Sequence, residues 1–110
     1  MRWLFHIATS ATWSAFQADG SDAYTAPSLA TEGFIHCSYR DAVAESAKLY
    51  FPKDASLVVL RIDPRALTAP VVVANTPRGP MPHVHGAIPR AAVRAVSSLA
   101  DFAREPDSIT

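Results

Sequence analysis

The order of its short apolar runs is the feature that most limits how this chain can fold. Only two segments have the spacing of helices, and both lie before Pro52. After Pro52 the apolar runs are short, bounded by proline, glycine or aspartate, and typical of strands. The resulting order is strand, helix, strand, helix and then mostly strands. This order predicts an α+β domain rather than an alternating parallel sheet.

The first strand and helix are predicted at the start of the chain. Trp3–Ala8 is short, apolar and rich in aromatic residues, which indicates a buried strand. Thr9 or Ser10 is a suitable N-cap for a helix that runs to about Ala18. Gly20 is then expected to end this helix.

The second predicted strand is followed directly by the second predicted helix. Phe34–Cys37 indicates a strand, and Ser38 with Asp41 three residues later resembles a capping box. We therefore expect the second helix to begin at Ser38 and to end before Pro52.

The second half of the chain is predicted to be mostly β. The proline-rich segment Asn75–Pro82 indicates a loop, and a polar tail is expected over residues 101–110, after a single domain over residues 1–100. The strands predicted here are Leu57–Ile62, Val71–Ala74 and Val93–Leu99.

Composition excludes several classes of function. Ten basic and ten acidic residues cancel, so nothing favours a nucleic-acid partner. No apolar run approaches the roughly 20 residues of a membrane helix, and no convincing signal peptide is present. The single cysteine excludes an internal disulfide. We expect a cytoplasmic protein without nucleic-acid or membrane partners.

The four histidines are the candidate functional residues. All of them lie in apolar, β-prone motifs: His6, His36, His83 and His85. A buried imidazole needs a specific partner, so such residues often mark a site. If their segments are extended, three of these motifs project imidazole toward one wall of a cleft. Strand alternation separates His36 from Cys37, so Cys37 is predicted to be a buried apolar residue rather than a nucleophile.

Other interpretations of these residues remain open. Each histidine, taken alone, is also consistent with a core residue that hydrogen-bonds to the backbone. His83 and His85 could instead supply two zinc ligands, with His6 or His36 as the third. Ser38 at a helix N-terminus offers free N–H groups to phosphate, and Tyr24, in an irregular segment, is the best candidate for an aromatic lid.

Four motifs occur in order along the chain: Phe5-His6-Ile7, Glu32-Gly33-Phe34-Ile35-His36-Cys37-Ser38, Leu60-Arg61-Ile62-Asp63 and Pro82-His83-Val84-His85-Gly86. Over about residues 3–99 the chain resembles the bacterial and plant family called domain of unknown function 952. The resemblance implies an ADP-ribosyltransferase-like fold: a mostly antiparallel, split β core with two main helices packed on it and a cleft for nicotinamide dinucleotide. It also implies that His6 binds a ribose hydroxyl. Ala74 and Asn75 stand where a glutamate is common.

The leading hypothesis is a cleft that binds a nucleotide such as NAD or ADP-ribose, with ribosyl-transfer or hydrolysis chemistry. His36 and His83 are the catalytic candidates, as acid and base near neutral pH. The residues expected to contact the ligand are His6, Thr9, Tyr24, Ser38 and His85. The alternatives are a non-catalytic module that binds a small ligand or a partner, which the missing glutamate favours, and a histidine-based metal site.

Overall fold

The computed structural model describes residues 2–104 as fifteen short elements. In chain order they are β1 (Leu4–Thr9), α1 (Ser10–Asp19), β2 (Ala23–Tyr24), α2 (Pro27–Glu32), β3 (Ile35–His36), a 3₁₀ turn (Arg40–Ala42), α3 (Val43–Tyr50), β4 (Leu57–Ile62), a 3₁₀ turn (Pro64–Ala66), β5 (Val71–Thr76), β6 (Gly79–Val84), β7 (Ile88–Pro89), a 3₁₀ turn (Arg90–Ala92), β8 (Val93–Ser98) and α4 (Leu99–Ala103). The predicted α+β class is confirmed, with α1 and α3 as the two main helices. None of the helices within residues 2–104 is long and apolar enough to span a membrane.

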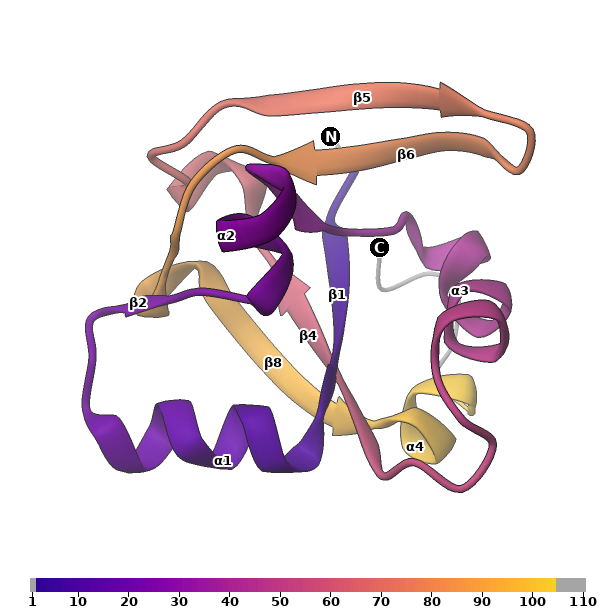
Figure 1. Cartoon of the computed structure of the whole chain (residues 1–110), viewed down its shortest axis with the longest axis horizontal. Coiled ribbons are helices and arrows are strands. Elements are labelled where there is room, and N and C mark those ends of the chain that lie inside the picture. The colour runs from indigo at the N-terminus through magenta and orange to yellow at the C-terminus, as the bar shows by residue number, and fades with distance from the viewer. Residues whose placement is uncertain (1, 105–110) are drawn as a thin grey trace.

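Two three-stranded antiparallel sheets form the framework. One has the order β1-β4-β8 and the other β3-β6-β5, while β2 and β7 form a small separate pair. Figure 1 shows the β5–β6 hairpin across one end of the molecule and α1 across the opposite end. A bridge joins the sheets, because Phe5 and Ser38 exchange backbone hydrogen bonds of 2.8 and 2.7 Å. This bridge brings the segment after β3 against the start of β1.

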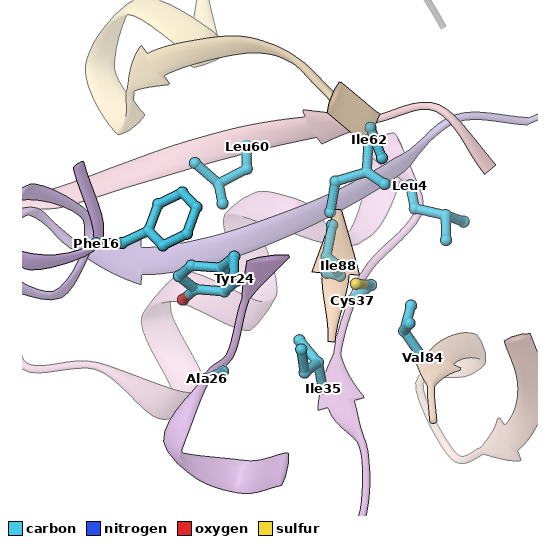
Figure 2. Close-up of a cluster of buried hydrophobic side chains, with 11 residues drawn as sticks. Leu4, Phe16, Tyr24, Ala26, Ile35, Cys37, Leu60, Ile62, Val84 and Ile88 are labelled. Carbon is cyan, nitrogen blue, oxygen red and sulfur yellow. The ribbon is translucent and has the colours of Figure 1, made fainter. Parts of the chain in front are cut away.

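Strand β1 separates the hydrophobic core into two clusters. Its alternating side chains place Leu4 on one face, and Phe5 and Ile7 on the other. The larger cluster lies between the two sheets, as Figure 2 shows. Its buried members are Leu4, Phe16, Tyr24, Ala26, Ile35, Cys37, Leu60, Ile62, Val84, Ile88 and Ala92.

The predictions for the first strand and helix are confirmed. Strand β1 shifts by one residue from the prediction, and α1 follows it directly. Thr9 caps α1, since its hydroxyl accepts a hydrogen bond from the backbone N–H of Thr12. Gly20 ends the helix in the left-handed conformation, at φ 72°. The predicted strand Leu57–Ile62 also has the observed bounds.

The loop predicted over Asn75–Pro82 is wrong, because most of this segment lies in the β5–β6 hairpin. Proline lacks the N–H that a sheet ladder uses, so proline-rich runs are normally assigned to loops. Here Cys37 N donates to Pro82 O at 3.1 Å, on the side of β6 that faces away from β5. The nitrogen of Pro82 points to that same side, as does that of Pro80 two residues earlier. The pairing of β6 with β5 therefore loses no hydrogen bond.

The helix predicted to begin at Ser38 begins later. Ser38 is held in the bridge to Phe5, so its backbone is extended and it does not cap a helix. Regular α-helix starts only at Val43, after a 3₁₀ turn. The Ser38 hydroxyl instead contacts that of Ser46, at 3.0 Å. The expectation that Ser38 binds phosphate through a helix N-terminus is therefore wrong.

The predicted tail begins inside a helix. Helix α4 spans Leu99–Ala103, and Phe102 packs in the smaller core cluster, with its ring 5.3 Å from that of Phe5. Residues 105–110 of the predicted tail lie outside the described residues. The boundary between domain and tail stays a prediction.

Candidate functional site

A cleft of about 810 Å³ lies among β1, the end of α3 and the tip of the β5–β6 hairpin. Its volume lies within the range typical of small-ligand sites. Side chains from β1, the start of α1, the β2–α2 segment, β3, the end of α3 and the hairpin line it. These residues are His6, Ile7, Ala8, Thr9, Thr12, Tyr24, Ala26, Pro27, Ser28, His36, Cys37, Ser38, Ser46, Leu49, Tyr50, Phe51, Thr76, Pro77, Arg78, Met81 and His83.

His6 is buried in the cleft wall and uses both ring nitrogens within the protein. Its Nδ1 lies 2.7 Å from the His36 carbonyl oxygen, and its Nε2 lies 2.9 Å from the Tyr24 hydroxyl. A carbonyl only accepts, so Nδ1 carries the proton and Tyr24 donates to Nε2. Burial lowers the pKa of His6 to about 4. His6 is thus a neutral imidazole that ties Tyr24 to the backbone of His36.

Tyr24 is a core residue and not a lid. Its side chain is 1% exposed, and its ring contacts those of Trp13, Phe16 and His6. Figure 2 shows the ring among the apolar side chains of the larger cluster. Burial raises the pKa of Tyr24 to about 12, so the phenol stays protonated at neutral pH. Because its proton goes to His6, its oxygen is left as an acceptor at the cleft wall.

His36 and His83 come together as the sequence predicted. They are opposite each other in the β3–β6 register, and their ring centroids are 5.4 Å apart. Phe34 stacks on His83 at 4.0 Å with an angle of 11° between the rings. Glu32 accepts a hydrogen bond of 3.1 Å from Nε2 of His36. With that nitrogen protonated, Nδ1 of His36 is the basic atom. Burial, with smaller contributions from His36 and His85, lowers the pKa of His83.

His85 is linked to this pair through Phe34. Its ring is 5.4 Å from that of Phe34, and its side chain is exposed and absent from the cleft lining. The geometry gives no support to a ligand contact by His85. Within residues 2–104, no group of three histidine, cysteine or acidic side chains is arranged to hold a metal ion. The described residues therefore give no support to the metal hypothesis.

A polar network closes the cleft at the end of α3. Arg78, on the turn between β5 and β6, donates from Nη1 to Glu45 at 2.9 Å and to Ser46 at 3.3 Å. Its Nη2 donates to the Tyr50 hydroxyl at 3.3 Å. Ser46 in turn contacts Ser38. These contacts fasten the hairpin tip to α3, which lies beneath it in Figure 1.

Cys37 lies at the cleft wall, but its thiol is buried. It is 2% exposed, and burial raises the pKa of its thiol to about 12. His36 points to the opposite face of the same strand, as strand alternation predicted. The interpretation of Cys37 as a small buried apolar residue is confirmed.

Two features of the site were not predicted from the sequence. One is Glu32, whose position four residues before His36 allows contact across the end of α2 and Gly33. The Arg78 network was missed because its partners lie more than 25 residues earlier in the chain. The spacing of Glu32 and His36 was a usable signal, whereas nothing local indicates the partners of Arg78.

Comparison with known proteins identifies the class of protein that carries this fold and cleft. A family model described as protein of unknown function (DUF952) matches residues 7–96, and the chain belongs to that family. The fold is similar to the crystal structure of protein CC0527 from Caulobacter crescentus, with a TM-score of 0.75 and 22% identity over 87% of this chain and 84% of that one. A double mutant of CC0527 gives the same TM-score at 21% identity and the same coverage. No curated protein matches the chain.

Proposed function

We propose that the cleft binds a nucleotide such as NAD or ADP-ribose. The observation that carries this proposal is the convergence of His36, His83 and the Tyr24 hydroxyl on one cleft of about 810 Å³. Apolar walls with a few convergent polar groups are typical of small-ligand sites. His6 orients the Tyr24 hydroxyl, whose oxygen can accept a hydrogen bond from a sugar hydroxyl. We therefore propose that Tyr24, rather than His6, contacts the ribose.

The imidazole pair suits acid–base chemistry on such a ligand. In hydrolysis or ribosyl transfer, the bond between ribose carbon and nicotinamide nitrogen breaks, and nicotinamide leaves with the electron pair. The oxygen of water or of an acceptor forms the new bond to that carbon and loses a proton. Nδ1 of His36 is the base that takes the proton, since Glu32 holds its Nε2. His83, neutral because its pKa is lowered, orients the nicotinamide side.

The architecture is compatible with an ADP-ribosyltransferase-like fold, which the family resemblance implies. The support is the split arrangement of two antiparallel sheets joined by one bridge. A fold likeness by itself indicates an activity only by analogy. The proposal therefore depends on the cleft and not on the fold.

Calorimetry with NAD and ADP-ribose tests the proposal. We expect binding at millimolar ligand or below, weakened about tenfold by His83→Gln, which removes a cleft-facing imidazole. His85→Gln is the matched control, since this ring lies outside the cleft lining, and it should leave affinity unchanged. Chromatography for released nicotinamide then tests turnover, which His36→Gln should abolish. Folded wild-type protein that binds neither nucleotide would contradict the proposal.

A second candidate is a module that binds the same ligand without turnover. The observation that favours it is that, among the described residues, none that lines the cleft is acidic. Ribosyl transfer passes through a cationic sugar that a carboxylate commonly stabilises. Binding without released nicotinamide, in both wild type and His36→Gln, would establish this alternative.

A further inference from the structure

Arg78 is held more firmly than a residue on a hairpin turn requires. Three hydrogen bonds to α3 fix the guanidinium of Arg78, and the Arg78 side chain is only 18% exposed. Its backbone is also fixed, since its N–H donates to Thr76 Oγ1 at 3.2 Å. A guanidinium fixed in this way loses little freedom when it binds a further group.

Two N–H groups of the Arg78 guanidinium make no hydrogen bond with the described residues. Arginine has five N–H donors, and the described contacts occupy three of them. Within residues 2–104, Nε–H and one N–H of Nη2 have no protein acceptor. Two N–H groups on one planar guanidinium can bind two oxygens of one anion. Since Arg78 lines the cleft, a ligand in the cleft can reach this side chain.

The buried serine pair adds another donor. Ser38 and Ser46 are each 4% exposed, and both line the cleft. One hydroxyl proton joins the two oxygens, whichever serine donates. The second hydroxyl proton is then left for a third acceptor. The cluster thus offers two N–H donors and one O–H donor, which together match the several acceptor oxygens of phosphate.

We infer that Arg78, Ser46 and Ser38 form an anion subsite that holds the phosphate groups of the ligand. The identity of the molecule that carries the phosphate rests on the proposed function. Gly79, beside Arg78, and His83 are four residues apart on β6, which is about 13 Å along a strand. The subsite and the imidazole pair therefore lie at opposite ends of the cleft. A ligand that contacts both must therefore be extended.

Pyrophosphate, titrated at constant ionic strength and followed by calorimetry, tests the subsite without the nucleotide. We expect wild type to bind it and Arg78→Gln to bind it at least about tenfold more weakly, because a charge-assisted pair is lost. Arg78→Lys should also lose affinity, since an ammonium lacks the planar fork. Glu45→Gln is the matched control: it breaks the same ion pair but keeps the guanidinium, so affinity should be kept or rise.

Thermal unfolding of the same variants separates binding from packing. If Arg78 served only to fasten the hairpin, Arg78→Gln and Glu45→Gln would lower Tm alike and neither would change pyrophosphate affinity. That result, or wild type that binds no pyrophosphate at 10 mM (about 2.7 kcal/mol), overturns the subsite. If Arg78→Gln binds ADP-ribose as wild type does, the subsite fails and the proposed function stands. If only pyrophosphate binds, the subsite stands and the proposed function fails.

Discussion

The buried imidazole of His6 predicts a specific loss of stability in acid. Its pKa falls from 6.5, the value expected in the unfolded chain, to about 4 in the folded protein. Between these two values the unfolded chain binds a proton that the folded protein does not, so the free energy of unfolding decreases as pH falls. Each tenfold difference in proton affinity is worth about 1.4 kcal/mol, which gives a loss of about 3 kcal/mol between pH 7 and pH 4. Below about pH 3, well under both pKa values, this contribution decreases no further.

Urea unfolding of wild type and His6→Gln at several pH values measures this contribution. Glutamine does not titrate, while the other three histidines and the carboxylates are common to both proteins. The difference in unfolding free energy between the two proteins should therefore shrink by about 3 kcal/mol from pH 7 to pH 4. Glutamine can retain one hydrogen bond, to the His36 carbonyl or to Tyr24, which favours a folded variant. A difference that stays constant over this pH range would refute the assignment of His6 as a neutral, buried imidazole.

Two further predictions concern other parts of the chain. Gly86→Ala should destabilise the protein by about 1–3 kcal/mol in urea unfolding, because the added Cβ would lie 2.7 Å from Cβ of Ala69. The double variant with Ala69→Gly should recover most of that loss, and no recovery would show that the contact is not the cause. Cys37 should react with a thiol reagent at pH 8 at least about 100-fold more slowly in native buffer than in guanidinium, because its pKa is raised to about 12. Equal rates in the two solvents would contradict its burial.

The parts of the fold that could be predicted depend on local patterns. Leu57–Ile62 is a continuous apolar run with clear boundaries, and Gly20 is a helix terminator by its backbone freedom alone. Strands β2 and β7 have two residues each, which is too short for a period to be recognised, whereas β3 lies within the predicted strand Phe34–Cys37. The β5–β6 hairpin was not predicted. Pro80 and Pro82 are compatible with the β5–β6 pairing only because their nitrogens face away from β5, and the sequence does not show which side they face.

The residues of the candidate site were likewise predictable only where the local sequence carries the signal. The histidine motifs indicated His36 and His83, because imidazole in a β-prone apolar setting is a chemical signal within a few residues. The roles of Tyr24 and Ser38 were misread, since each is decided by a partner that the local sequence does not show. Tyr24 bonds to His6, 18 residues away, and Ser38 is held by Phe5.

The pairing of the two histidine motifs is produced by the core. Ile35 lies opposite Val84 in the β3–β6 register, and both side chains are fully buried. Strand alternation then turns their neighbours, His36 and His83, to the opposite face, where both line the cleft. A register slip of one residue would expose two large apolar side chains in exchange for burying imidazoles, so the alternative pairing is strongly disfavoured. The hydrophobic pattern therefore positions the candidate catalytic pair without any attraction between the imidazoles, whose positive forms repel each other.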